Sequence, residues 1–358
     1  MRMQSPVRTQ RTPGRARPRV WPVLQALLLA AGAGILLALF FAPALGLTLL
    51  WNVLIPAAPL LFLLVPGVWR NLCPLATASL LPHRFGWSRG RRLPRRVQAW
   101  TALGGVVLLM LLVPARRIVF DHHAAAAVWL LLGAGALAFG AGLLFEAKSG
   151  WCAGLCPVRP VETLYGERPL ATVENAHCGS CSYCSTPCPD ATPASQPGRG
   201  GSALADRLAH HLMVGAFPGF VWAWFHVPDA LGGASAAHAL RAYGLPLAAG
   251  AVTWALYALV RARTPEARRP RLVRGFALAS AACYYWYRLP ALLGFGIVPG
   301  DGVLVDARGR LPEWTPWLLQ ATVFAAALAL FLVRKENRAR AWQRRPAPGR
   351  KSRKALRV

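Results

Sequence analysis

Eight long apolar runs constrain this chain more than any other feature of its sequence. Each run is about long enough to cross a bilayer, which takes roughly 20 residues. Inside a bilayer every backbone polar group must be satisfied within its own segment, so such runs form helices. The sequence therefore predicts an all-α polytopic membrane protein with about eight transmembrane helices. The runs cover residues 20–42, 45–69, 97–113, 124–145, 208–227, 243–260, 272–297 and 317–333.

The composition excludes the main alternatives to a membrane protein. The 358 residues are 55% hydrophobic and only 15% charged, with a mean hydropathy of +0.37. Soluble domains are about one quarter charged, and disordered chains are far less apolar. A soluble protein of two or three domains would therefore not contain eight such runs.

Basic residues outnumber acidic ones by 41 to 13, and their placement predicts the topology. Short cytoplasmic loops carry the Lys/Arg excess of membrane proteins. Both termini are thus predicted to be cytoplasmic, which an even number of spans allows. Topology accounts for the charge, so no nucleic-acid partner is expected. The basic segments are 1–19, 70–96, 261–274 and 334–358, whereas 114–123, 228–241 and 298–313 contain one or two basic residues each.

One loop, residues 146–207, differs from the others because it is charge-balanced and rich in cysteine. It contains Cys178, Cys181, Cys184 and Cys188, followed by Pro189, in the C-x2-C-x2-C-x3-C-P spacing of bacterial ferredoxins. Three thiolates at this spacing wrap one cubane, and the fourth ligates the other cluster in two-cluster ferredoxins. Structural zinc, the alternative, normally uses separated pairs. The run predicts a 4Fe–4S cluster in a cytoplasmic ferredoxin-like loop.

Two Leu-Cys-Pro triplets form a second, repeated signal. One contains Cys156 within a C-x3-C-P motif that begins at Cys152, and the other contains Cys73 directly after the second apolar run. Alignment of the triplets puts Trp69 at the position of Cys152, and each triplet follows a pair of spans. We interpret this pattern as an internal repeat of a two-helix unit that lacks one cysteine in its first copy. The alternative is a packed Cys73 thiol and a chance likeness.

The motifs divide the chain into five segments. These are a basic cytoplasmic N-terminus (1–19), four transmembrane helices (20–145) with a Cys-Pro loop at 70–96, a cytoplasmic iron–sulfur loop (146–207), four further transmembrane helices (208–333) and a basic cytoplasmic tail (334–358).

Over roughly its first 190 residues, the chain resembles the membrane-bound ferredoxin-type (4Fe–4S binding) proteins of the NapH and NosR kind. Those polytopic proteins have cytoplasmic C-x3-C-P motifs at helix ends and ferredoxin-type cysteine runs. They are associated with electron supply to periplasmic nitrate or nitrous-oxide reductases, and a related branch serves cytochrome oxidase assembly and copper reduction. The resemblance implies a multi-pass protein of the bacterial inner (cytoplasmic) membrane. This chain departs from it in having one ferredoxin run, one cysteine in its first Cys-Pro motif and four additional spans.

The cysteine count leaves the number of clusters open. Seven cysteines are predicted to be cytoplasmic, and two all-cysteine cubanes need eight. Either one cluster is held by the first three cysteines of the run and one Cys-Pro cysteine, or a second cluster has one non-cysteine ligand. In the second arrangement Cys188 joins Cys152 and Cys156 on the second cluster, while Cys73 or Cys156 completes the first.

Polar residues in or near the spans offer further sites. Cys283 lies mid-span and is expected to be a packing residue. Arg288 is either functional, the default for an arginine inside a span, or it snorkels to the outer surface. Two histidines on neighbouring helices can hold a haem, but none here is centred at mid-depth, so a haem is not favoured. The histidines at span ends are His122, His123, His210, His211 and His226.

These observations predict a membrane-bound iron–sulfur electron-transfer protein. It would pass electrons between a cytoplasmic or quinol donor and a redox partner protein in the membrane or periplasm, as an electron-transfer subunit or a component of a quinol-linked oxidoreductase. The alternative is an accessory protein whose cluster senses redox state or iron, or assists the maturation of a metallo-enzyme. An independent nucleotide site is not supported, because the sequence has no P-loop or Gly-rich nucleotide motif.

Overall fold

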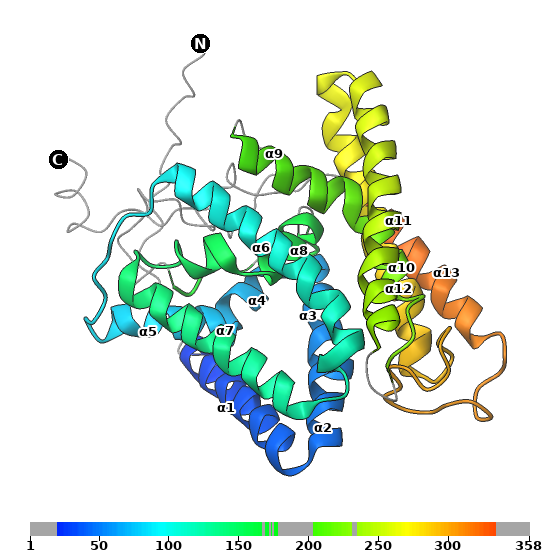
Figure 1. Cartoon of the computed structure of the whole chain (residues 1–358), viewed down its shortest axis with the longest axis horizontal. Coiled ribbons are helices and arrows are strands. Elements are labelled where there is room, and N and C mark those ends of the chain that lie inside the picture. Colours follow the sequence, from blue (N-terminus) through cyan, green and yellow to red (C-terminus); the bar gives the residue numbers. More distant parts are fainter. Residues whose placement is uncertain are drawn as a thin grey trace.

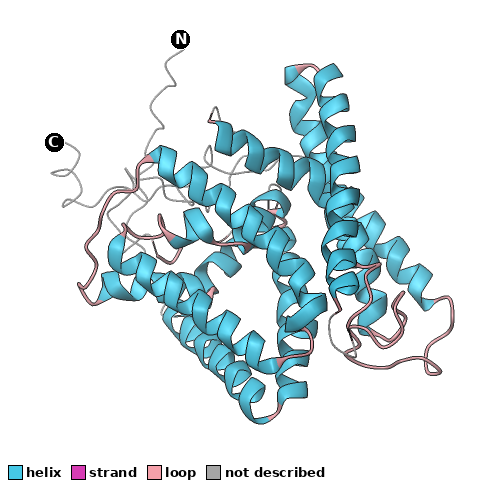
Figure 2. Ribbon diagram, viewed as in Figure 1, coloured by secondary structure: helices cyan, strands magenta, loops and turns pink. Residues whose placement is uncertain are grey.

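The computed structural model describes residues 20–166, 169–171, 173, 175–177, 203–230 and 235–333 of the chain. Over these residues the protein is built from helices and contains no strand (Figures 1 and 2). The all-α prediction is confirmed for this part of the chain. The four cysteines of the ferredoxin run and both predicted cytoplasmic tails lie outside it.

The first half of the chain contains eight α-helices and three short π-helical turns within the described residues. In chain order they are α1 (Val20–Phe41), α2 (Pro43–Thr48), η1 (Leu49–Leu54), α3 (Ile55–Leu64), α4 (Pro66–Leu72), α5 (Pro74–Arg84), α6 (Arg95–Ala115), η2 (Arg116–Phe120), α7 (Ala124–Leu144), η3 (Trp151–Leu155) and α8 (Val158–Tyr165).

The second half continues with longer helices. They are α9 (Leu204–His210), η7 (His211–Ala216) and α10 (Phe217–Trp224), which form one continuous helical segment, then α11 (Ala236–Arg263), the short 3-10 turn η8 (Glu266–Arg268), α12 (Arg269–Leu292), α13 (Thr315–Leu328) and η9 (Ala329–Val333). In Figure 1, α11 and α12 stand side by side as a hairpin whose tip reaches beyond α9.

Six helical segments are long and apolar enough to cross a membrane. They correspond to six of the eight predicted spans. The other two predicted spans are helical as well, but they lie inside the bundle: seven of the eight residues of α10 are buried. A helix surrounded by other helices needs a less apolar surface than one surrounded by lipid, because protein rather than lipid contacts its polar groups. The six are Val20–Phe41, Pro43–Leu64, Arg95–Phe120, Ala124–Leu144, Ala236–Arg263 and Thr315–Val333.

The second predicted run, 45–69, is not one straight span. Its helix ends at Leu64, and Val65 takes an extended conformation (φ −146°, ψ 73°) before α4 begins at Pro66. The residue that precedes a proline is disfavoured in the α conformation, which explains the break at this position. The break separates the apolar span from the short helix α4, which ends at Cys73.

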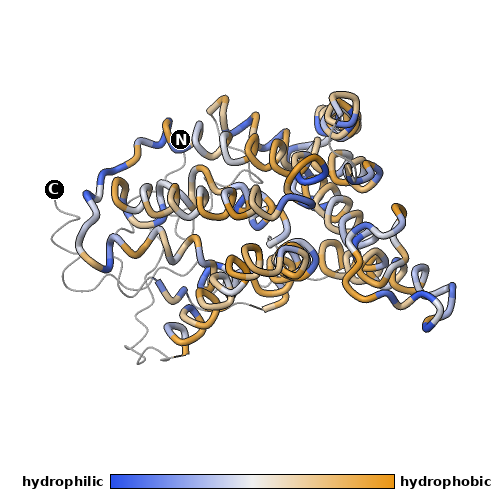
Figure 3. Tube along the Cα trace, turned by 60° about the horizontal axis from the view of Figure 1, so that its bottom comes forward, coloured by the Kyte–Doolittle hydropathy of each residue, from blue (hydrophilic) through white to orange (hydrophobic). Residues whose placement is uncertain are grey.

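The main hydrophobic core joins the two halves of the molecule. It contains buried residues of α3, α6 and α8 together with residues of α9, η7, α10, α11 and α12. By contrast, α1, α11 and α13 expose large apolar side chains, and hydrophobic residues follow the helices while hydrophilic ones gather in the connecting loops (Figure 3). Such exposed apolar helices are expected of a protein surrounded by lipid.

Candidate metal centre

The two Leu-Cys-Pro triplets adopt the same backbone conformation. Cys73 has φ −50° and ψ 120°, and Cys156 has φ −63° and ψ 114°. Each cysteine joins a short helical turn to a following helix: α4 to α5 in the first copy, and η3 to α8 in the second. The proline after each cysteine suits the start of a helix, where its missing N–H is not needed. The shared geometry supports the interpretation of an internal repeat.

Hydrogen bonding refines the alignment of the two copies. The Cys73 N–H donates to the Trp69 carbonyl (2.8 Å), whereas the Cys156 N–H donates to the carbonyl of Trp151 (3.0 Å). The structural counterpart of Trp69 is therefore Trp151. The sequence alignment had placed Trp69 opposite Cys152, one residue further along the chain. The extra residue is accommodated because η3 is a π-helical turn, a feature that often occurs at functional sites.

Both Cys-Pro thiols face the same chemical environment. Burial raises the pKa of the Cys73 thiol, while the backbone N–H groups of Ala76 and Leu75 lower it. Burial also raises the pKa of Cys156 to about 12, and the N–H groups two and three residues further along the chain oppose this effect. The charge of Cys73 acts on Cys156, so the two thiols are close to each other. Burial is the largest effect on the pKa of both thiols and favours their neutral form, whereas the neighbouring backbone N–H groups are donors of the kind that stabilises a thiolate.

Buried polar side chains connect the two copies of the repeat. Arg70 of α4 forms an ion pair with Glu162 of α8, and both side chains are 8% exposed. Arg159 of α8 donates from Nη1 to the Cys152 carbonyl (3.1 Å). Lys148 is also buried. Buried charges are stable only when they are paired or hydrogen-bonded, so this cluster holds the two cysteine loops in a defined relative position.

The chain enters the ferredoxin run at this cluster. Asn71, which is fully buried, accepts a hydrogen bond at Oδ1 from the Ala176 N–H (2.9 Å). The buried ring of His177 lies 3.3 Å, through Nε2, from the Arg70 carbonyl. The described part of the chain therefore ends, directly before the ferredoxin run, beside Arg70 and Asn71.

A glycine on α6 allows the second cysteine loop to approach closely. A Cβ atom on Gly105 would lie 2.8 Å from the Gly154 carbonyl oxygen and 3.1 Å from that of Cys156. Contacts this short would displace one of the two backbones. The absence of a side chain at position 105 thus sets the position of the Cys152–Cys156 loop against α6.

The described residues contain no group of three or more His, Cys, Asp or Glu side chains that could hold a metal ion. Cys73 and Cys156 are brought together, and Cys152 lies half-buried on η3. Cys178, Cys181, Cys184 and Cys188 lie outside the described residues. Their assignment as ligands stays a prediction, as does the number of clusters.

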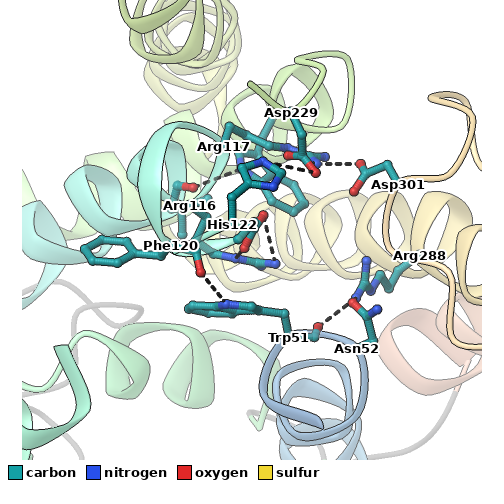
Figure 4. A network of polar contacts seen from close by, with 12 residues as sticks. Trp51, Asn52, Arg116, Arg117, Phe120, His122, Asp229, Arg288 and Asp301 are labelled. Carbon is teal, nitrogen blue, oxygen red and sulfur yellow. Dashed lines mark hydrogen bonds and ion pairs between the residues drawn. The ribbon is translucent and has the colours of Figure 1, made fainter. Parts of the chain in front are cut away.

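A second polar network lies beyond the C-terminal end of α6, on η2 and the loops around it (Figure 4). Arg117, only 1% exposed, pairs through Nη1 with Asp229 (2.7 Å) and with Asp301 (2.5 Å). Its neighbour Arg116 pairs with Asp121 (2.9 Å). These contacts join three loops that are distant in the sequence and that we predicted to be poor in basic residues. No local sequence spacing links Arg117 with Asp229 and Asp301, so the sequence alone does not predict this network.

Arg288 does not snorkel to the surface. It is 4% exposed and donates from Nη2 to the Trp51 carbonyl (2.7 Å) and to Oδ1 of Asn52 (2.6 Å). The Asn52 side chain in turn donates to the Val303 carbonyl (3.1 Å). These contacts tie α12 to η1 (Figure 4), while a functional role of Arg288 stays a prediction.

Three of the five histidines at the predicted span ends contact other groups of the protein. His122 lies 3.8 Å from Asp229, and the His226 ring nitrogen Nδ1 contacts the Trp222 carbonyl (2.8 Å). His210 Nε2 is 2.6 Å from the Tyr257 hydroxyl. Cys283 of α12 is partly buried against the main core, the place expected of a packing residue.

One curated protein shows similarity to this chain. The methylamine utilization ferredoxin-type protein MauN of Paracoccus denitrificans (strain Pd 1222) is 31% identical over 146 residues, which amounts to 37% of this chain and 51% of MauN. The chain thus spans about half the length of this relative. No protein-family model matches the chain. No solved structure matches it either. The similarity supports a ferredoxin-type relationship and suggests an iron–sulfur electron-transfer role for a protein with apolar helices.

Proposed function

We propose that the protein is a multi-pass electron-transfer protein of the bacterial inner membrane, of the NapH and NosR kind, with a 4Fe–4S cluster at its cysteine-bearing end. Cys178, Cys181 and Cys184 hold the cluster, together with Cys188 or a Cys-Pro cysteine. The bound cluster supplies one-electron chemistry. It exchanges electrons with a cytoplasmic or quinol donor and with a redox partner in the membrane or periplasm.

One observation carries the proposal: residues 176 and 177, directly before the ferredoxin run, contact Asn71 and Arg70, which lie within three residues of Cys73. The anchors are the Asn71 hydrogen bond to the Ala176 N–H and the contact between His177 and Arg70. Cluster ligands must converge from different parts of the chain, and residues 73 and 156 already do so. The partial similarity to a ferredoxin-type protein supports the same assignment.

The protein's own residues have two tasks in this function. Backbone N–H groups that face the Cys73 and Cys156 thiols stabilise their anionic form and so tune a bound cluster. The Arg70–Glu162 pair and the buried side chains around it keep the two loops together and limit the access of water. Both effects act on the reduction potential, since that potential depends on hydrogen bonds to sulfur and on exposure.

Anaerobic purification with iron and acid-labile sulfide analysis and redox-poised EPR tests the proposal. Substitution of Cys178, Cys181 or Cys184 by serine should remove or convert the cluster, because each supplies a ligand within one loop. Cys283→Ala, which changes a thiol on α12 far along the chain from the run, is the matched control and should leave the iron content unchanged. Stoichiometric zinc without charge-transfer absorption would overturn the assignment.

The Cys-Pro cysteines distinguish one cluster from two. With two cubanes the wild type should bind about eight irons, and serine at Cys73, Cys152 or Cys156 should lower that number in each case. With a single cubane the wild type should bind about four, and at most one of these three variants should lose iron. Wild-type iron near four with unaffected Cys73 and Cys152 variants would exclude the second cluster.

A further inference from the structure

A separate basic cluster lies in the second half of the molecule, where α11, α12 and η7 meet. Arg261 lies in the last turn of α11, and Arg269 is the first residue of α12. His211 begins η7, which packs against both helices. Tyr257 lies one helical turn before Arg261 on the same face of α11. We refer to Arg261, Arg269, His211 and Tyr257 as the hairpin site.

Tyr257 gives the hairpin site a rigid base. Its side chain is fully buried, and its ring packs edge-on against Phe276 of α12 at 5.0 Å. A Cβ atom on Gly215 would lie 3.0 Å from the Tyr257 ring, so that glycine is needed for the ring to lie where it does. The hydroxyl accepts a hydrogen bond from Arg261 Nη1 (3.3 Å) and lies 2.6 Å from His210 Nε2.

The positive charges of the site converge on this tyrosine. Arg261 and Arg269 are the two charged groups that act electrostatically on the Tyr257 hydroxyl, and Arg261 also acts on His211. Arg269 precedes Phe276 by seven residues, or two helical turns, so it lies on the face of α12 that contacts Tyr257. Two guanidinium groups from different helices therefore face one small region.

No carboxylate balances these charges among the residues that the structure describes. Glu266, the acid between the two arginines in the sequence, is exposed on η8, and no ion pair joins it to either of them. Burial raises the pKa of Asp206 on α9, and no arginine is among the groups that act on it. The buried nitrogens Arg269 Nε and His211 Nδ1 have no hydrogen-bond partner in this part of the chain. The Arg269 Nε–H is a donor, and leaving a buried donor without an acceptor is costly. A bound anion would supply that acceptor between the two guanidinium groups.

We propose that the hairpin site binds the phosphate group of an anionic phospholipid. The depth of the site favours a lipid, because Arg261 lies within the last three residues of an apolar helix long enough to span the membrane. A guanidinium at that level meets lipid headgroups, and basic pockets between transmembrane helices are known to bind them. The planar fork of arginine also matches the paired oxygens of a phosphate.

Native mass spectrometry of the full-length protein, titrated with phosphatidylglycerol or phosphatidylcholine, tests the proposal. The double variant Arg261→Gln/Arg269→Gln should bind phosphatidylglycerol about tenfold or more weakly, since each arginine near a headgroup contributes appreciably to lipid binding. The matched control is Arg263→Gln/Arg271→Gln, which removes the same charge from exposed positions of the same hairpin. The control should keep most of the wild-type preference for phosphatidylglycerol over phosphatidylcholine.

Equal losses in the two double variants would overturn the proposal, because they would show attraction by net charge alone. Displacement of the lipid by millimolar inorganic phosphate would also overturn it, since the occupant would then be a free anion. If the double variant does not fold, Arg269→Lys keeps the charge but not the fork, and it should weaken phosphatidylglycerol binding several-fold; unchanged binding would count against the site. Iron content, measured in parallel, should not change in any of these variants.

Discussion

The Arg117 network, beyond the C-terminal end of α6, and the cysteine loops, which pack on the middle of α6, differ in which polar groups are already paired. Arg117 pairs with two aspartates of the protein, although its buried Nε has no hydrogen-bond partner among the described residues. The cysteine loops instead contain two partly buried thiols, each with backbone N–H groups facing it. Gly105 and Arg117 are 12 residues apart on α6 and η2, or roughly 18 Å along the helix. Buried ion pairs occur in both places, so buried charge alone does not distinguish a candidate metal centre. The two neighbouring thiols distinguish it.

The largest expected difference between the two ends is their side of the membrane. The N-terminus, the cysteine loop and the C-terminus should face the cytoplasm because the arginine-rich segments do so in short-looped membrane proteins. Alkaline-phosphatase and fluorescent-protein fusions at Gly200 and Val358 measure this directly. Fluorescence without phosphatase activity is expected at both sites. Phosphatase activity at Gly200 would place the cysteine loop outside the cytoplasm. Phosphatase activity at Val358 would contradict the predicted cytoplasmic C-terminus.

Arg117→Gln should destabilise the protein strongly. It leaves Asp229 and Asp301 buried without a counter-charge, and breaking a buried pair in this way costs about 3–5 kcal/mol. Thermal unfolding in detergent measures the loss. Arg308→Gln, which breaks the exposed pair with Asp306, is the control and should produce no measurable change. The iron content of the folded fraction should not change, because this end holds no cluster ligand. A loss of iron at full stability would show that the two ends are coupled.

Gly105→Ala should disturb the Cys152–Cys156 loop without affecting the Arg117 network. The new methyl group would collide with the carbonyl oxygens of Gly154 and Cys156, and overpacking of this kind costs about 1–3 kcal/mol. The expected result is reduced iron retention after purification. Gly104→Ala is the matched control, since its Cβ would come no closer than 3.4 Å to Leu155 Cδ2. Alanine also favours the helix at both positions. Equal iron in the two variants would disprove the role given to Gly105.

The smallest change in the free energy of unfolding is expected from Asp229→Asn. Burial is the largest cause that raises the pKa of this carboxyl, Asp301 raises it further, and Arg117 opposes both. Because the folded state holds the proton more tightly than the unfolded state, Asp229 stabilises the protein most below its unfolded pKa. That contribution is lost as the pH rises through its folded pKa. Asp229→Asn resembles the protonated form and should cost less than about 1 kcal/mol near pH 7.

Thermal midpoints measured between pH 5 and pH 8 test this sign. The stability of the wild type relative to Asp229→Asn should increase as the pH falls. If Asp229→Asn were as unstable as Arg117→Gln, the ionised carboxylate would be needed for stability. The same would follow if the stability of the wild type relative to Asp229→Asn increased with pH.

Much of the helical architecture follows from the apolar runs. The predicted segments 20–42, 97–113 and 124–145 coincide closely with α1, α6 and α7, because length and apolarity are local properties of a chain. The break before Pro66 is also local in origin, and attention to the residue that precedes the proline would have found it. The burial of α10 and α12 could not be predicted in this way, since it depends on which helices surround them.

The candidate site was predicted only in part. The Leu-Cys-Pro triplets indicated equivalent turns, and the structure confirms that Cys73 and Cys156 share a backbone conformation. The correspondence of Trp69 with Trp151 was missed, because a π-helical turn changes the hydrogen-bond register without a sequence signature. The contacts of Asn71 and His177 were missed as well, since each joins groups more than 100 residues apart.

The sequence by itself determined the helices, the cysteine spacing and the charge pattern that predicts the topology, because each of these depends on residues that are neighbours in the chain. Only the tertiary structure decided which polar groups complete one another. It paired Arg117 with Asp229 and Asp301 and brought Cys73 to Cys156, and it left the buried Nε–H of Arg269 without an acceptor within the described chain. The physical reason is that a buried polar group must find its partner in space, whatever the distance along the sequence.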